Sequence, residues 1–331
     1  MSFYKLSGLG IASFLLFGSP IKATASGFSD FVFYGDSVTD SGNVFLATGE
    51  ITEPPFGDIV PQRPYASQTF SDDRVWAQYL ADFNGLDAAP SLGGGTNFAF
   101  GGATSQPLDT VASPSLEEQF TFWQQATGNV ADPDAFYFIQ GGGNDVRIAG
   151  TLGSVSEASL FLDNGVNSIE TIVTGLIDAG ATNIAVLNSP DIGLLPLSVL
   201  AGVTPEATAL SQAYNTSLAE SLASLETEDV NLISVDLFGF INDVVSDPTA
   251  FNLPTNTITD LPCILPDSVC ANPDEYVFYD GIHPTSAVQF EFANLVNEQI
   301  QQQTQSTPEP STLLIGLGSV FFLRRRKTAR R

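Results

Sequence analysis

The segment FVFYGDSVTDSGN, residues 31–43, joins a run of apolar and aromatic residues directly to a run of small and polar ones. Residues 31–35 have the composition of a buried strand. Gly-Asp-Ser follows at once, and these residue types are common in tight turns. Ser37 is therefore expected just beyond the end of a buried strand. The position of that strand in the fold determines which residues lie near the serine.

The rest of the chain alternates strand-like and helix-like segments. Four further apolar runs have strand character: residues 96–100, 135–140, 183–188 and 230–237. Helical spacing or helix-end signals mark residues 72–83, 160–180, 204–228 and 285–303. Apolar strands separated by helices are typical of a parallel sheet covered by helices on both faces. We expect an α/β fold with a mostly parallel five-stranded sheet, formed by one domain over residues 26–303.

Residue types that can take part in catalysis or binding follow several of these strands. In an open α/β sheet the ligand crevice lies beyond the carboxyl ends of the strands. Gly101-Gly102 follows the second run, GGGND (residues 141–145) follows the third, and YDGIHP (residues 279–284) precedes the final helix. The residues predicted to gather at this edge are Ser37, Gly102, Asn144, Asp280 and His283.

His283 is the only histidine in the chain, so an enzyme that uses a histidine base has no other candidate. Asp280 lies three residues earlier, a spacing that allows its carboxylate to accept a hydrogen bond from Nδ1 and hold the tautomer. Each of the other features also has a purely structural explanation. Gly-Asp-Ser is common turn chemistry, paired glycines serve tight turns, and Asn144 is a good helix cap.

Taken together, these segments resemble the GDSL lipases and esterases of the SGNH hydrolase superfamily. The resemblance rests on four blocks in order: FVFYGDSVTDSGN, NFAFGGA, GGGND and DGIHP. It departs from the family name only at Val38, which replaces a leucine. The resemblance implies a three-layer α/β/α, flavodoxin-like fold, and we expect no cofactor or metal.

The resemblance also implies roles for particular residues. Ser37 would be the nucleophile and His283 the base, with Asp280 orienting the imidazole. The backbone N–H groups of Ser37 and Gly102, with the side-chain amide of Asn144, would form the oxyanion hole. Three polar neighbours of the serine are expected to support the loop and to take no part in the chemistry: Asp36, Asp40 and Asn43.

The charge of the chain limits its partners. The formal net charge is −26, and between residues 26 and 306 three arginines stand against 36 acidic residues, which gives −33 for that part. Nucleic acid is excluded as a partner because phosphate binding needs clustered lysine and arginine. Some of the acids are candidates for calcium, but no Asp-x-Asp-x-Asp-Gly loop with a following glutamate is present.

Cys263 and Cys270 lie close together in a proline-rich segment. In an exported protein such a pair favours a disulfide. Two free thiols are the alternative, and a metal site has little support in a chain with one histidine.

The two ends of the chain have the patterns of export signals. Residues 1–25 combine a basic start, a short apolar run and an Ala-Thr-Ala exit, as a secretory signal peptide does; a helix retained in the fold is the alternative. Residues 304–310 form a linker containing Pro-Glu-Pro, and residues 311–331 contain an apolar stretch and a basic tail. This order resembles the PEP-CTERM sorting signal of bacterial envelope proteins, which implies processing by an exosortase-type peptidase. The apolar stretch of 13 residues, 311–323, is shorter than the about 20 residues of an unassisted span. It would thus be a transient membrane segment, with a simple tail anchor as the alternative.

These observations favour an exported serine ester hydrolase of the bacterial envelope or exterior, acting on small-molecule or lipid esters. Two alternatives use the same fold. One is a deacetylase of extracellular polysaccharide, and the other is a surface or matrix protein without turnover. The oligomeric state stays open.

Overall fold

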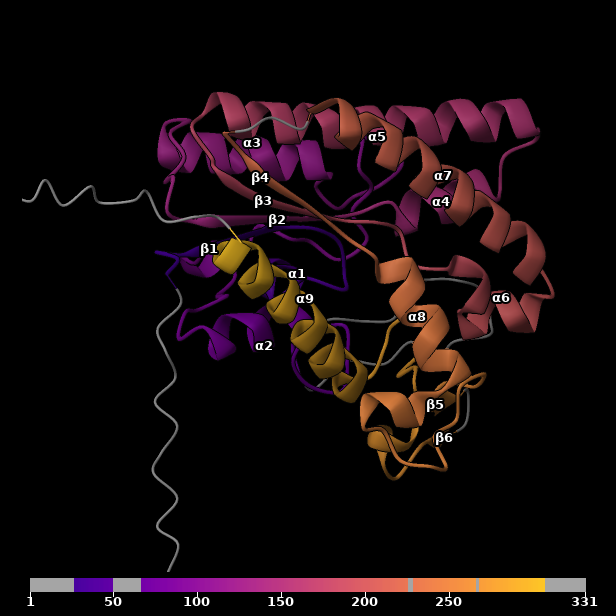
Figure 1. The fold of residues 1–331 in the computed structure, drawn as a ribbon. Coiled ribbons are helices and arrows are strands. Elements are labelled where there is room, and N and C mark those ends of the chain that lie inside the picture. Colours follow the sequence, from indigo (N-terminus) through magenta and orange to yellow (C-terminus); the bar gives the residue numbers. More distant parts are fainter. Residues whose placement is uncertain (1–26, 50–66, 226–228, 266–267, 307–331) are drawn as a thin grey trace, which may run out of the picture.

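The computed structural model describes residues 27–49, 67–225, 229–265 and 268–306, and it shows an α/β fold built on a parallel sheet (Figure 1). The strands of this sheet are β1 (Phe31–Tyr34), β2 (Phe136–Gln140), β3 (Asn183–Leu187) and β4 (Asn231–Val235). They lie in the order β1-β2-β3-β4 and all neighbours are parallel. The predicted fold class is confirmed.

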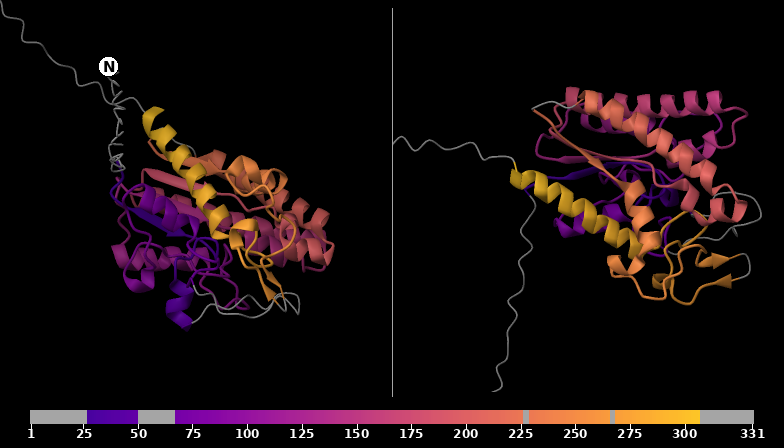
Figure 2. Two further views of the ribbon diagram at one scale, coloured as in Figure 1. Left: turned by 90° about the horizontal axis from the view of Figure 1, so that it is seen from below. Right: turned by 45° about the vertical axis from the view of Figure 1, so that its right-hand side comes forward.

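Helices cover both faces of the sheet, as parallel strands require. One face carries α3 (Leu116–Thr127), α4 (Gly143–Ala149), α5 (Val155–Asp178) and α7 (Thr204–Leu225). The other carries α2 (Trp76–Phe83), α8 (Leu237–Ser246) and α9 (Ser286–Ser306). The shorter elements are α1 (Asn43–Thr48), α6 (Pro196–Ala201), η2 (Ser91–Gly93), η3 (Ile192–Leu194), η4 (Pro248–Phe251) and η5 (Pro273–Glu275). Figure 2 shows the sheet between the long helices of one layer and the yellow α9 of the other.

Aromatic side chains dominate the core around β1 and β2. Phe33 stacks on Phe138 with ring centroids 5.0 Å apart, and Trp76 of α2 meets Phe33 edge-on at 5.6 Å. Because side chains alternate along a strand, the next residues face the other layer. There Tyr137 meets Trp123 of α3 at 6.0 Å. Each buried phenylalanine contributes about 1.5–3 kcal/mol, so these rings hold the carboxyl end of β1 in place.

The prediction of a fifth regular strand at residues 96–100 is wrong. The segment runs beside β1 and pairs with Phe33 only through a bridge at Asn97. The Asn97 side chain is buried and bonds to backbone: its Oδ1 accepts from Ala99 N at 3.0 Å, and its Nδ2 donates to Thr39 O at 2.8 Å. The local turn made by Asn97 interrupts the ladder, so the described sheet has four strands.

The predicted helix at 72–83 begins later than expected, at Trp76. Asp72, at the start of the predicted range, contacts α9 instead: its Oδ1 accepts a 2.7 Å hydrogen bond from Ser286 N, at the start of α9. The Ser286 hydroxyl also donates to Arg74 O at 2.8 Å. This junction fixes the start of α9 directly behind His283.

A small antiparallel hairpin of β5 (Ile264–Leu265) and β6 (Ser268–Val269) lies below α8 in Figure 1. The expected disulfide between Cys263 and Cys270 is confirmed and closes this hairpin. Cys263 N donates to Phe278 O at 3.0 Å, so the hairpin is bonded to the segment that leads to Asp280.

The predictions for the chain ends concern residues 1–25 and 307–331, which lie outside the described residues. Helix α9 continues to Ser306, beyond the predicted domain end at residue 303. Within the described ranges no helix has both the length and the apolar character needed to cross a membrane.

Candidate active site

The sharp turn after β1 presents Ser37 at the carboxyl edge of the sheet. Gly35 begins the turn, and a Cβ there would lie 2.9 Å from the Thr39 side chain and 3.0 Å from Gln140 Oε1, so only glycine fits. The Asp36 carboxylate accepts from Val38 N at 2.9 Å, and the Asp36 carbonyl accepts from the next two N–H groups. Asp36 thus closes the turn, which agrees with the supporting role that the sequence suggested for it.

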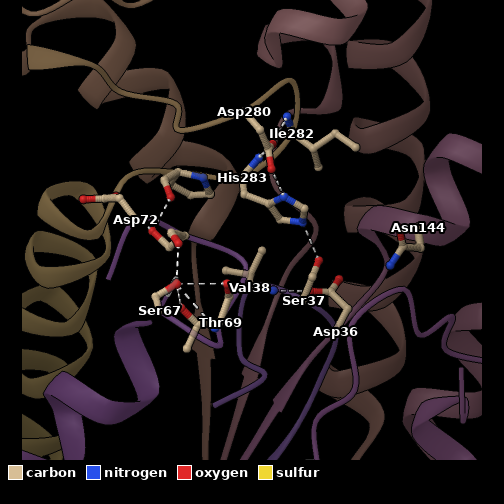
Figure 3. Close-up of polar contacts among 12 residues, drawn as sticks. Asp36, Ser37, Val38, Ser67, Thr69, Asp72, Asn144, Asp280, Ile282 and His283 are labelled. Carbon is tan, nitrogen blue, oxygen red and sulfur yellow. Dashed lines mark hydrogen bonds and ion pairs between the residues drawn. The ribbon is translucent and has the colours of Figure 1, made fainter. Parts of the chain in front are cut away.

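Ser37, His283 and Asp280 form a continuous hydrogen-bonded line (Figure 3). His283 Nε2 lies 2.8 Å from Ser37 Oγ, and His283 Nδ1 lies 2.7 Å from Asp280 Oδ2. The other carboxylate oxygen of Asp280 accepts from the backbone N–H groups of Ile282 and His283, both at 2.7 Å. Asp280 and His283 are each only 1% exposed, so the imidazole has little freedom to turn.

Asn144 lies in α4, which follows β2, and Gly102 lies in the turn that follows the second apolar run. Asn144 Nδ2 donates one hydrogen bond to Ala103 O at 2.8 Å, and Arg147 donates to Asn144 Oδ1 at 3.0 Å. Figure 3 shows the amide on the Ser37 side of α4. Gly102 has φ +81°, a conformation that favours glycine. Within the described chain, neither Ser37 N nor Gly102 N has a hydrogen-bond acceptor.

Asp40 and Asn43 build the loop around the serine, as expected. Asp40 Oδ1 accepts from Gly42 N and Asn43 N, and its Oδ2 accepts from Gly101 N at 2.9 Å. The Asn43 amide reaches across to Asn97 O and Ala99 O at 2.8 and 2.9 Å. Both side chains therefore tie the serine loop to the glycine segment.

Two acids near the site, Asp36 and Asp145, are buried, and Arg147 is half-buried. Burial raises the pKa of Asp36, against the hydrogen bonds that it accepts from Val38 N and Gln140 Nε2. Burial also raises the pKa of Asp145, to about 6, although Ser105 donates to its carboxylate. Burial lowers the pKa of Arg147 to about 10, while Asp36 and Asp280 act in the opposite direction. At neutral pH Arg147 is therefore a cation beside Asn144.

A mostly apolar pocket opens beside Ser37, with a cavity volume of about 40 Å³. Arg147 and Asn144 contribute to its polar side. Its apolar walls come from the end of β3, from η3, from α8 and from the His283 segment: Pro190, Ile192, Leu195, Leu237, Ile241, Phe278, Ile282 and Pro284. In the described ranges no group of three or more His, Cys, Asp or Glu side chains is arranged to hold a metal ion.

Sequence reasoning missed the residues that hold the site from behind. Gln119 of α3 bonds both the N–H and the carbonyl of Gly35, each at 2.9 Å. Phe70 lies 5.3 Å from the His283 ring, and its own ring occupies the space where a Cβ on Gly101 would be. These residues form no motif, because their partners lie far away in the sequence. Of these two residues only Gln119 gave a signal in the sequence, because it is an amide on the apolar side of a helix.

A buried serine, histidine and aspartate in line at the carboxyl edge of a parallel sheet define the site of a serine hydrolase. The chain belongs to the GDSL-like lipase/acylhydrolase family, whose model matches residues 31–296. As a member of this family it is a carboxylic ester hydrolase.

Similar proteins include a GDSL esterase/lipase of Arabidopsis thaliana, 24% identical over 299 residues, with 77% of this chain and 81% of the relative covered. Another Arabidopsis thaliana relative, 27% identical over 297 residues, is named an inactive GDSL esterase/lipase-like protein; 80% of this chain and 70% of the relative are covered. Among solved structures, an acetylxylan esterase from Geobacillus stearothermophilus matches with a TM-score of 0.42 and 16% identity. That match covers 82% of this chain and 93% of the esterase.

Proposed function

We propose that the protein hydrolyses carboxylic esters through an acyl-enzyme on Ser37, with His283 as the base and Asp280 as its orienting partner. The observation that carries the proposal is the line from Ser37 Oγ to His283 Nε2 to Asp280 Oδ2, with distances of 2.8 and 2.7 Å. A serine hydroxyl is a weak nucleophile until an adjacent base takes its proton during attack. The geometry provides such a base at hydrogen-bond distance.

In the proposed reaction Ser37 Oγ bonds to the acyl carbon while its proton passes to His283 Nε2. The tetrahedral intermediate then breaks its bond to the alcohol oxygen, and His283 returns the proton to the departing alkoxide. Water attacks the acyl-enzyme with His283 again as base, and the acid leaves as Ser37 regains its proton. Asp280 accepts from Nδ1 throughout, which keeps the Nε2 lone pair directed at Ser37.

The developing oxyanion needs donors that are already in place. The N–H groups of Ser37 and Gly102, which meet no acceptor in the described chain, would serve here with the remaining N–H of the Asn144 amide. Arg147 holds the amide oxygen of Asn144, so the amide nitrogen faces the serine. Removing one such donor typically reduces kcat by about 10²–10³.

The apolar pocket supports esters with a small apolar group beside Ser37. The cavity volume of about 40 Å³ is small, so a short acyl group fits beside Ser37 more easily than a long one. This small volume also favours the second candidate function, removal of acetyl groups from extracellular polysaccharide. Longer lipid acyl chains would have to extend out of the pocket.

The proposal includes export. It is supported by the signal-peptide pattern of residues 1–25 and by the sorting-signal pattern of residues 308–331. The enzyme domain would then run from residue 26 to the end of α9, and a membrane peptidase would process the C-terminal segment. Edman sequencing and intact-mass measurement of protein recovered from the producing bacterium would test both cleavages.

The proposed activity is tested with p-nitrophenyl acetate, butyrate, octanoate and laurate, in the presence of salt. Wild type should be active and should prefer the two shorter esters, while Ser37→Ala and His283→Ala should lose at least about 10³-fold in kcat. A wild type inactive on every ester, or variants that match it, would refute the assignment. Release of acetate from acetylated xylan would then be measured separately to test the second candidate.

A further inference from the structure

We propose that Ser113 is a positioning residue of the oxyanion hole. Its hydroxyl holds the peptide between Gly101 and Gly102 in the one orientation that turns the Gly102 N–H towards the reacting carbonyl. This inference rests on the proposed function, and it adds a residue that no sequence block contains.

The contact is direct. Ser113 Oγ donates a hydrogen bond to Gly101 O. A peptide group is planar and trans, so its C=O and its N–H point in opposite directions. The carbonyl of Gly101 and the N–H of Gly102 belong to the same peptide group. A donor that fixes the carbonyl on one side therefore fixes the direction of the Gly102 N–H on the other.

The turn that contains this peptide has two accessible forms. Ala103 N donates to Phe100 O at 3.1 Å, which closes a four-residue turn with Gly101 and Gly102 at its centre. The φ of +81° at Gly102 is that of a type II turn, and rotation of the central peptide gives a type I turn. In the type I form the Gly102 N–H would point away from its present direction.

The ends of the turn are anchored, so its central peptide can rotate without moving them. Phe100 N donates to Gly35 O at 3.1 Å, and Ala103 O accepts from Asn144 Nδ2. Gly101 must be glycine because the Phe70 ring lies 2.1 Å from its would-be Cβ. With glycine at both central positions, side-chain sterics restrain the rotation little. The hydroxyl of Ser113 supplies the missing restraint.

Ser113 is itself held in place. Two residues later Ser115 caps α3, with its hydroxyl accepting from Glu118 N and its own N–H donating to Glu118 Oε2 at 2.8 Å. Leu116 N donates to Thr104 O at 3.0 Å, which ties the start of α3 to the end of the glycine segment. The donor hydroxyl therefore stands on a fixed support.

A positioning role predicts a particular kinetic result. The Gly102 N–H bonds the oxyanion far more strongly than it bonds the neutral ester, so loss of its orientation lowers kcat and leaves KM unchanged. We expect a fall in kcat of about 10-fold, less than the about 10²–10³ for complete loss of a donor, because a part of the molecules keeps the type II turn.

The test compares Ser113→Thr with Ser113→Val, which have the same shape and differ in the hydroxyl, together with Ser113→Ala. Thr182→Val is the control, because Thr182 Oγ1 also donates to a backbone carbonyl, Pro133 O, at the opposite edge of the sheet. For each protein we would measure kcat and KM with p-nitrophenyl acetate, the melting temperature, and inhibition by an alkyl trifluoromethyl ketone. Such a ketone forms a tetrahedral adduct with an oxyanion.

The expected result is that Val and Ala at position 113 lower kcat about 10-fold and lower the affinity for the ketone by the same factor, with KM unchanged. Thr at position 113 and the Thr182→Val control should behave as wild type. Equal kcat for the Thr and Val variants would overturn the inference, and so would a loss of kcat without a matching loss of ketone affinity. Wild type with no turnover and no ketone inhibition would instead refute the proposed function, and the inference with it.

Discussion

Substitution of Asp280 by asparagine is the most informative perturbation of the site, because the carboxylate has two different duties. Oδ2 accepts from His283 Nδ1, and Oδ1 accepts from two backbone N–H groups, all at 2.7 Å. Both positions require an acceptor. Asparagine has one oxygen and one NH₂ group, so it can satisfy only one position.

The asparagine can therefore bind in two ways, and both impair the site. If its oxygen stays with the backbone N–H groups, the NH₂ faces Nδ1 and stabilises the tautomer that carries the proton on Nε2. That imidazole cannot accept the proton of Ser37. If the amide turns over, its NH₂ meets two buried N–H groups, and a buried donor without a partner costs about 1–3 kcal/mol.

The expected loss in kcat for Asp280→Asn is about 10⁴-fold, the size seen when a buried triad aspartate is replaced in this way. This corresponds to about 5.5 kcal/mol of barrier height. The assay is kcat and kcat/KM on p-nitrophenyl acetate, with the melting temperature measured in parallel. Asp274→Asn is the matched control, because Asp274 is exposed in η5 and its replacement makes the same change in net charge. A fall of less than about 10-fold in Asp280→Asn, in a protein that stays folded, would refute this account of the site.

The contacts of Asn144, of Asp145 and of the Cys263–Cys270 disulfide also have measurable effects. Asn144→Ala should lower kcat about 10²–10³-fold with little change in KM, measured on the same esters; an equal rise in KM would point to ground-state binding. Burial raises the pKa of Asp145 to about 6 from 3.8, so the folded state binds more protons between about pH 4 and pH 6, and the free energy of unfolding should fall by about 3 kcal/mol as pH rises through that window. Asp145→Asn should lack this part of the fall in urea titrations at pH 4 and pH 7, and an identical pH dependence in both proteins would contradict it. Replacing both Cys263 and Cys270 by alanine should destabilise the hairpin by about 2.5 kcal/mol, seen as faster proteolysis of residues 258–279, while an unchanged digestion pattern would argue against a supporting role.

The sequence allowed the arrangement of Ser37, Asp280 and His283 to be predicted because the topology of the sheet fixes where these residues lie. Once β1 and β2 are parallel neighbours, the residues that follow them must lie at one edge. His283 could be chosen as the candidate base from the sequence alone, because it is the single histidine of the chain. The local roles of Asp36 and Asp40 were also accessible, because their bonds to Val38, Gly42 and Asn43 span only two or three residues.

Other features depend on contacts between distant residues and could not be read from the sequence. Residues 96–100 have strand composition, but the buried Asn97 side chain competes for the backbone and prevents a regular strand. Phe70 and Ser113 support the glycine segment from 31 and 12 positions away, and neither belongs to a periodic pattern. Helix α4 was not predicted for a different reason: it starts inside GGGND, where the glycines indicate a turn.

Covalent labelling of the nucleophile tests the central claim most directly. The full chain, Ser37→Ala and His283→Ala would be treated with a fluorophosphonate ester, and the adduct located by intact mass and peptide mass spectrometry. We expect one adduct per chain, on Ser37, with none in Ser37→Ala and a much slower reaction in His283→Ala. An adduct on another residue, or ester turnover that persists in Ser37→Ala, would contradict it.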